Sequence, residues 1–206
     1  GGVPGTLLGA LASRIVGGDR LLVLSGLMLL VVGVRMLLPD PEGAAARAEA
    51  MLKFADALAA RGDVMGQTIT RENGTPISES AAAAAHSAGI LRYYASLAGY
   101  VDQDDKRPFP GAARKYTQVY REPRGVCLLI APWNFPLTLV MVKLAPALIA
   151  GCTVVIKPAA ETPLDLRVLI AAAEDAGIPA GVINVLTGGR ESGGLMVQHR
   201  GIAKVA

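Results

Sequence analysis

The sequence is poor in the residues that build metal sites and disulfide frameworks. Its 206 residues include two cysteines and two histidines. Cys127 and Cys152 each lie in an apolar stretch, while His86 and His199 are far apart along the chain. A disulfide framework needs more cysteines, and a zinc site needs closely spaced ligands. We therefore expect neither kind of site, and we expect both cysteines to be buried core thiols.

Long runs of one charge are also missing. The 20 Lys and Arg residues nearly balance the 17 Asp and Glu residues, so the net charge is +3. Nucleic-acid-binding proteins usually carry a clustered basic patch or stripe, and no such cluster occurs here. The charge pattern therefore excludes nucleic acid as the expected partner.

Apolar residues are plentiful and concentrated before Pro39. Residues 21–38 are almost unbroken Leu, Val, Met and Gly, interrupted only by Ser25 and Arg35. A run of this length can just span a bilayer, and the alternative is a buried core helix. We predict an apolar helical segment over residues 1–41, and a cytoplasmic protein that is membrane-associated if residues 21–38 insert.

Residues 1–38 loosely resemble the closing helices of sulfite exporter-like permeases. A short apolar segment is followed by a Gly-Gly-Asp-Arg turn and then by the long apolar run. The chain starts at Gly1 without methionine and stops at Ala206 within a strand-like run. We interpret the chain as a fragment in which a permease-like segment precedes part of a second protein.

Helical periodicity begins after this segment. Apolar residues recur at intervals of three and four over residues 44–61, which predicts a helix that ends at Gly62. A turn at 71–76 precedes a second predicted helix over 78–99, with Ser78 as its cap. Charged residues, prolines and a glycine over 102–114 indicate a surface loop, after which a strand resumes.

Four short apolar runs in the second half of the chain predict a parallel sheet. The first three begin 28 and 29 residues apart, about the length of a strand-helix-strand unit. The fold class is therefore α/β, with a partial, Rossmann-like, doubly wound sheet preceded by helices. The second connecting helix is expected to begin with Thr162 as cap and Pro163 at its first position, and to stop at Gly177. The predicted strands cover residues 125–131, 153–156, 182–186 and 202–206.

Ligands of such sheets bind beyond the carboxyl ends of the strands, which here are residues 132–136, 157–161 and 188–190. No Gly-x-Gly-x-x-Gly pattern follows the first strand. Lys157 ends the second strand and could bond ribose hydroxyls or a 2′-phosphate, or it could be a solvated surface lysine. Asn134 could donate its amide to a developing oxyanion, or it could be an ordinary turn residue.

Several motifs together resemble the aldehyde dehydrogenase superfamily over residues 44–206. They are Glu-Pro-Arg-Gly-Val at 122–126, Ala-Pro-Trp-Asn-Phe-Pro at 131–136, Lys-Leu-Ala-Pro-Ala-Leu at 143–148 and Lys-Pro-Ala at 157–159. The Glu-Asn-Gly-Thr-Pro turn at 72–76 and the Asn-Val-Leu-Thr-Gly stretch at 184–188 extend the match. The resemblance implies that residues 42–206 are an incomplete NAD(P)-binding domain.

The same resemblance implies roles for individual residues. Asn134 would be the catalytic oxyanion-hole residue and Lys157 the contact to the adenosine ribose of NAD or NADP. Ala160 stands where many members have a ribose-binding glutamate, with Glu161 one place later, and Arg190 replaces a loop glycine. The choice between NAD and NADP therefore stays open. The cofactor-binding residues carried over are Ile130, Ala131, Pro132, Trp133, Asn134, Lys157, Ala159, Glu161, Gly189 and Gly193.

The family oxidises an aldehyde to a carboxylic acid with a cysteine nucleophile and a glutamate base. Both groups lie further along the family's sequence, so this chain is expected to be inactive alone. The alternatives are a membrane-tethered nucleotide-binding protein without catalysis and a purely structural remnant. Residues 116–121 correspond to the hairpin through which family members form homo-oligomers. Because the other assembling strands are missing, we expect an exposed, aggregation-prone edge here.

Overall fold

The computed structural model describes residues 43–103, 105–111 and 114–206. The apolar segment predicted over residues 1–41, its membrane span at 21–38 and its permease resemblance all lie outside these ranges. Within the described ranges, no helix is both long enough and apolar enough to cross a membrane. The membrane prediction thus has no support from the described part of the chain.

The centre of the fold is a four-stranded parallel sheet. Its strands are β3 (Val126–Ile130), β4 (Thr153–Lys157), β5 (Ile183–Val185) and β6 (Lys204–Val205). Their spatial order is β5-β4-β3-β6, and every neighbouring pair is parallel. The predicted α/β class and doubly wound sheet are confirmed. The strand order reverses between β3 and β6, which makes the carboxyl end of β3 the switch point where such folds bind ligands.

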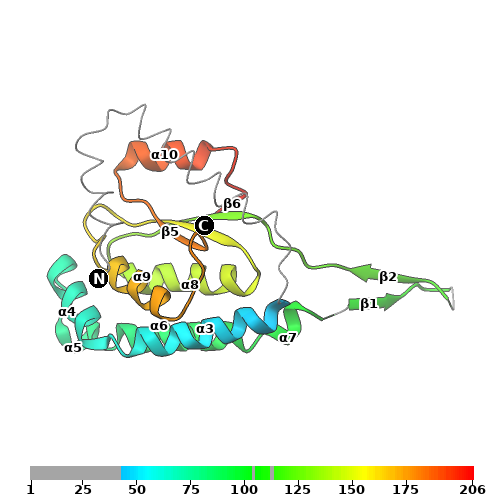
Figure 1. The fold of residues 1–206 in the computed structure, drawn as a ribbon. Helices are drawn as coiled ribbons and strands as arrows, with labels where there is room; N and C mark the ends of the chain where they lie inside the picture. The colour runs from blue at the N-terminus through cyan, green and yellow to red at the C-terminus, as the bar shows by residue number, and fades with distance from the viewer. Residues whose placement is uncertain (1–42, 104, 112–113) are drawn as a thin grey trace.

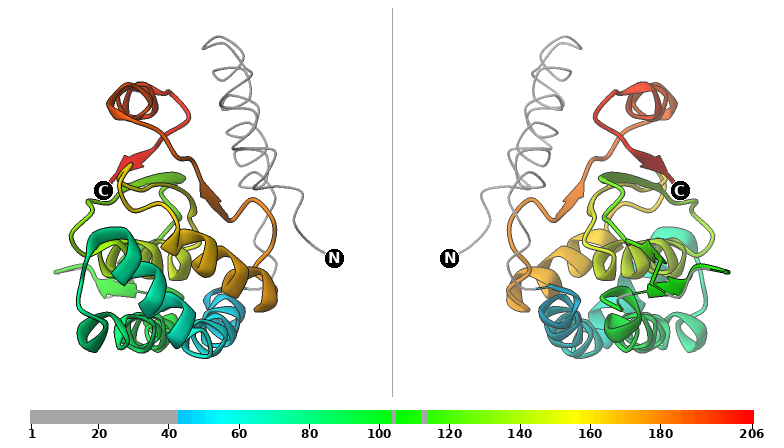
Figure 2. Two further views of the ribbon diagram at one scale, coloured as in Figure 1. Left: turned by 90° about the vertical axis from the view of Figure 1, so that its left-hand side faces the viewer. Right: turned by 90° about the vertical axis from the view of Figure 1, so that its right-hand side faces the viewer.

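Helices cover the two faces of the sheet unequally. The connecting helices α8 (Pro136–Ile149) and α9 (Asp165–Asp175) lie on one face, and α10 (Arg190–Gln198) lies on the other. The side views in Figure 2 show a further helical layer beneath α8 and α9. One face of the sheet is therefore deeply buried, while the other is covered by α10.

The further layer is formed by the helices that precede the sheet. These are α3 (Gly43–Ala59), α4 (Gly62–Asn73), α5 (Ile77–Ser80), α6 (Ala83–Ala95) and α7 (Ala98–Val101). The first predicted helix is confirmed as α3, but Gly62 also opens α4, which the sequence patterns missed. The helix predicted over 78–99 is divided into three. Ser78 lies inside α5 and is not its cap, because extended Pro76 occupies the N-cap position.

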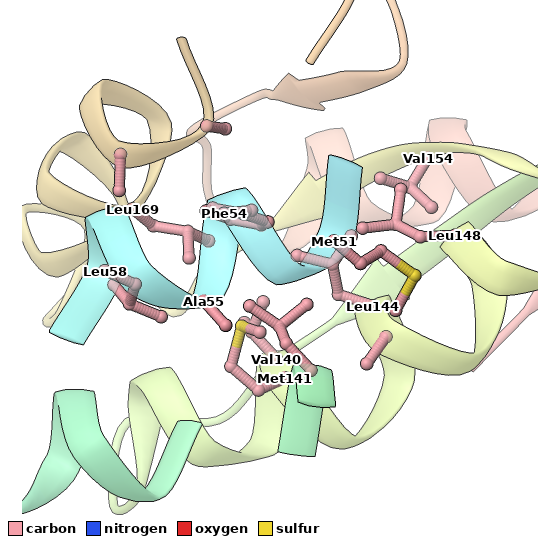
Figure 3. Close-up of a cluster of buried hydrophobic side chains, with 14 of the residues drawn as sticks. Met51, Phe54, Ala55, Leu58, Val140, Met141, Leu144, Leu148, Val154 and Leu169 are labelled. Carbon is pink, nitrogen blue, oxygen red and sulfur yellow. The ribbon is translucent and has the colours of Figure 1, made fainter. Parts of the chain in front are cut away.

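Two hydrophobic clusters flank the sheet. In the larger cluster, Phe54 and Leu58 of α3 pack with Met141 and Leu144 of α8, as Figure 3 shows. Side chains alternate along each strand, so the next residues of β3 and β4 face the opposite way. Val126 and Leu128 of β3 and Val155 of β4 form the smaller cluster with Met196 of α10. Both faces of β3 are therefore buried, as its unbroken apolar run predicted.

A β-hairpin projects from this body (Figure 1). The strands β1 (Asp105–Pro108) and β2 (Tyr116–Val119) are antiparallel, with Asp105 opposite Val119. The strand predicted to resume after the surface loop is confirmed as β2, but the loop predicted over 102–114 contains β1. The prediction failed because three of the four β1 side chains are exposed, so backbone pairing and not burial determines this strand.

The start of α9 also differs from the prediction. The helix begins at Asp165 and its N-cap is Leu164, not Thr162, and Pro163 therefore precedes the helix. The carboxylate of Glu72, distant in sequence, accepts hydrogen bonds from the backbone N–H groups of Leu164 and Asp165. A side chain from another helix thus replaces the local cap. The predicted stop is confirmed, since Gly177 adopts a φ of 76° directly after the C-cap.

Candidate functional site

Hydrogen bonds between neighbouring strands bring the ligand-facing loops together at the carboxyl edge of the sheet. The N–H of Ile130 donates to Ala206 O at 2.9 Å, and the N–H of Ala131 donates to Lys157 O at 3.1 Å. The loops that follow β3 and β4 therefore leave the sheet side by side. Lys143 of α8 donates its Nζ to Ile130 O at 2.6 Å, which ties the last residue of β3 to the helix that follows.

The loop after β3 is exposed. Pro132, Trp133, Asn134 and Phe135 are all exposed, and buried Pro136 opens α8. The loop is bound to the end of α4, because Asn73 Nδ2 donates to Trp133 O at 3.1 Å. The structure thus brings the motif at 72–76 into contact with the motif at 131–136, although the hairpin separates them in the sequence. The sequence did not predict this contact of Asn73, whose one local signal is its place in the motif at 72–76.

Asn134 lines a hollow of about 370 Å³ between this loop and the helices α4 to α6. The hollow's lining is mainly apolar, with Glu79 and His86 as its ionisable side chains. Asn134 therefore borders a space that can hold a small organic molecule. The remaining lining residues are Ile69, Thr75, Ser80, Ala82, Ala83, Phe135, Pro136, Leu137 and Thr138.

Lys157 lies on the α10 side of the sheet. It is only 8% exposed, and its Nζ donates to Pro158 O at 3.1 Å. A Cβ atom built on Gly193 would lie 3.3 Å from Lys157 Cε, so the lysine side chain lies directly against α10. The structure therefore brings Lys157 and Gly193 together, and the interpretation of Lys157 as a solvated surface lysine is wrong.

The glycines before α10 have separate roles. Gly189 is the N-cap of α10, is exposed, and has open space where a side chain would stand. At Gly188 a Cβ would lie 2.5 Å from Ser192 Oγ, so the position has no room for a side chain unless Ser192 moves. The sequence placed 188–190 in a ligand-facing loop and assigned Gly189 to the cofactor, but sequence alone does not show that Gly188 is the glycine packed against Ser192.

Ala159 and Glu161 follow Lys157 in the loop after β4. Ala159 is partly buried, and its carbonyl accepts a hydrogen bond from Thr162 N at 3.3 Å. Glu161 is exposed on the same loop. Both residues lie at the carboxyl edge of the sheet, as the sequence predicted, and both are reachable from solvent beside Lys157.

A buried carboxyl group lies behind this loop. Asp165 is fully buried, and neither of its side-chain oxygens has a hydrogen-bond partner among the described residues. Burial, reinforced by the nearby charge of Glu72, raises the pKa of Asp165 to about 7. The sequence marked Asp165 only as an acidic first-turn residue, so its burial is a result of the tertiary structure.

The two cysteines are buried and cannot reach a substrate in the folded chain. Cys127 is 3% exposed and Cys152 is 5% exposed, and both are free thiols of the larger cluster. A hydrogen bond with Cys152, together with burial, raises the pKa of the Cys127 thiol. The prediction that both are core thiols is confirmed. In the described ranges, no group of three or more His, Cys, Asp or Glu side chains could hold a metal ion.

Comparison with known proteins matches most of this chain to aldehyde dehydrogenases. Residues 42–206 match the aldehyde dehydrogenase family. The chain is 45% identical over 161 residues to geranial dehydrogenase of Castellaniella defragrans, a match that covers 78% of this chain and 33% of that protein. It is 42% identical over 166 residues to phenylacetaldehyde dehydrogenase of Pseudomonas fluorescens, with the same two shares. The chain thus spans about a third of the length of these curated relatives.

Solved structures agree with the sequence comparison. The aldehyde dehydrogenase from Brucella melitensis biovar abortus 2308 superposes with a TM-score of 0.81 and 34% identity. The match covers 86% of this chain and 37% of that one. The α/β architecture described above is therefore shared with solved relatives over most of this chain.

Proposed function

This chain belongs to the aldehyde dehydrogenase family, and from that premise we propose that it forms the cofactor-binding side of an enzyme that oxidises an aldehyde to a carboxylic acid. The cofactor expected from the family is NAD or NADP. One observation carries the proposal: Asn134, at the switch point of the sheet, lines a hollow large enough for a small organic substrate.

In the proposed reaction, Asn134 stabilises negative charge on the aldehyde oxygen. Attack on a carbonyl carbon moves charge onto that oxygen, and a fixed amide donor lowers the energy of this state. The exposed side chain of Asn134 can reach a substrate held in the hollow. The apolar lining of the hollow favours an aldehyde with an apolar side chain.

The residues near Lys157 fit the ribose side of a nicotinamide dinucleotide. The cofactor, when bound, supplies the acceptor for the aldehyde's hydride. Lys157 offers an ammonium donor, and Gly193 leaves the space that the lysine stem occupies. The ammonium has three N–H donors, so Lys157 Nζ can donate to a ribose hydroxyl while it keeps its bond to Pro158 O.

The nucleophile is not supplied by the described residues of this chain. The family's chemistry needs a thiolate that can reach the aldehyde carbon, while Cys127 and Cys152 are buried in the core. We propose that this stretch of sequence positions the cofactor and the aldehyde oxygen. On its own it is expected to bind cofactor weakly and to turn over no aldehyde.

Titration with NADH and NADPH tests this function. Trp133 is the only tryptophan and lies on the loop next to the proposed site, so energy transfer from Trp133 to the reduced nicotinamide reports binding. Lys157→Met keeps the apolar stem and removes the ammonium. We expect it to weaken binding about tenfold or more, the effect of losing a charge-assisted hydrogen bond.

The matched control is Lys53→Met. Lys53 is an exposed lysine of α3, paired with Glu49 on the same helix. This variant should bind cofactor as the unmodified chain does. Equal affinity of Lys157→Met and the unmodified chain would contradict the role of Lys157, and absence of any binding would contradict the proposed function.

A further inference from the structure

The side chain of Asn73 joins two loops that are far apart in sequence. Asn73 is the last residue of α4, and Gly74 after it adopts a φ of 79°. Asn73 Oδ1 accepts a hydrogen bond from Thr75 N at 3.0 Å, and Asn73 Nδ2 donates to Trp133 O at 3.1 Å. One amide thus closes its own turn and holds the loop after β3.

We infer that Asn73 is a positioning residue, which sets the place of Asn134 by holding the peptide bond between Trp133 and Asn134. This inference rests on the proposed function of Asn134. The carbonyl of Trp133 and the N–H of Asn134 belong to one planar peptide unit. Fixing that carbonyl therefore fixes the orientation of the peptide from which Asn134 starts.

The loop needs such a restraint because packing holds it little. Residues 132–135 are all exposed, and Trp133 retains 56% of its accessible surface. An oxyanion donor acts only when its position is set before the charge develops. The hydrogen bond from Asn73 restrains the loop, which its own packing does not do.

Glu72, the residue before Asn73, also connects the end of α4 to a loop of the site. Glu72 accepts hydrogen bonds from the backbone of Leu164 and Asp165, at the end of the loop after β4. Two consecutive residues of one helix therefore hold the loops after both central strands. The end of α4 thus holds the loop that carries Asn134 and the loop that follows Lys157 at a fixed distance from each other.

The replacement Asn73→Asp separates the two bonds. An aspartate has nearly the same shape and still accepts from Thr75 N, but its ionised carboxylate cannot donate to Trp133 O. The matched control is Asn184→Asp in β5. Asn184 Nδ2 also donates to backbone carbonyls, Val154 O at 3.0 Å and Gly181 O at 2.8 Å, away from the loop that carries Asn134.

Two measurements on the 206-residue chain report the loop. Acrylamide quenching of Trp133 fluorescence, without cofactor, reports how well the loop is held. NADH titration reports the consequence for the site. For Asn73→Asp we expect stronger quenching and an affinity lower by about fivefold, as for one lost hydrogen bond. Asn184→Asp should leave Trp133 quenching unchanged even where it lowers the midpoint of urea unfolding.

Amide hydrogen exchange keeps the test decisive if Asn73→Asp is also less stable. Faster exchange at Ala131, whose N–H donates to Lys157 O at the start of the loop, with unchanged exchange in the middle of β3 and β4, supports the inference. Unchanged quenching and exchange at the loop, or equal changes in both variants, overturn it. If the unmodified chain does not bind NADH, the proposed function fails, while quenching and exchange still decide whether Asn73 holds the loop.

Discussion

The side chain of Lys157 lies against the backbone of Gly193, with Cε and Cδ 3.3 and 3.4 Å from where a Cβ on that glycine would be. Lys157 ends β4 and Gly193 is in the middle of α10. The absence of a side chain at Gly193 is what lets the lysine stem run beneath the helix. Lys157 and Gly193, which the sequence assigned to the cofactor site as two independent residues, therefore pack against each other.

Gly193→Val is expected to destabilise the fold. A branched side chain would overlap the lysine stem, and overpacking of this kind costs about 1–3 kcal/mol. Urea unfolding measures the change. Gly194→Ala is the control, since nothing lies within 4 Å of its Cβ position; it should be neutral or stabilise by up to about 1 kcal/mol through helix propensity. Equal stability of Gly193→Val and the unmodified chain would show that Lys157 moves aside freely.

Glu72→Ala should weaken the start of α9. The replacement removes both hydrogen bonds to the backbone of Leu164 and Asp165, and loss of a helix cap costs about 0.5–2 kcal/mol. The cost should be larger at pH 5 than at pH 8, because at pH 8 removing Glu72 also relieves its repulsion of ionised Asp165. Urea unfolding at both pH values measures the difference. Glu79→Ala, an exposed glutamate of α5, is the control. A cost independent of pH would argue against the coupling.

Asp165 should make the protein less stable as the pH rises. Its folded pKa of about 7 lies above the ordinary value of 3.8, so between about pH 4 and pH 7 the folded state binds more protons than the unfolded state. The free energy of unfolding therefore falls through this window, by up to about 4 kcal/mol, and is lowest above pH 7.

Asp165→Asn removes this titration. The variant should lose the fall in stability between pH 4 and pH 7, and it should exceed the unmodified chain in stability at pH 8. Denaturant unfolding across the pH range measures both effects. If the two proteins show parallel pH profiles, the carboxyl of Asp165 is not the group that titrates.

Both cysteines should be unreactive until the protein unfolds. Cys127 and Cys152 are almost fully buried, and a thiol must be accessible as well as ionised to react. An aromatic disulfide reagent should therefore label neither thiol in buffer and both in guanidinium. Single replacements with alanine identify which thiol reacts. Rapid labelling of either thiol in the folded chain would contradict the described core.

Patterns within short segments were sufficient to predict the sheet. Apolar runs such as 125–131 and 153–156 are buried on both faces, and burial on both faces requires a continuous apolar run whatever the neighbours are. The stop of α9 was also predictable, because a left-handed residue at Gly177 is a local backbone requirement. The same holds for the position of Lys157 at the end of β4 and of Asn134 in the loop after β3.

Features that depend on distant residues could not be predicted in this way. The cap of α9 comes from Glu72, which is 92 residues before Leu164, and β1 exists because β2 pairs with it. The hydrogen bond from Asn73 to Trp133 O and the close approach of Gly188 to Ser192 are likewise defined by residues that the local sequence pattern does not show.

The sequence by itself determined the α/β class, the order of its strands along the chain and the residues at their carboxyl ends, because these follow from hydrophobic periodicity and local backbone preference. Only the tertiary structure decided that Asn73 holds the loop of Asn134, that Lys157 runs under Gly193, and that Asp165 is buried next to Glu72. Those relationships arise from contacts between segments far apart in the chain, and such contacts leave no periodic pattern within any one segment.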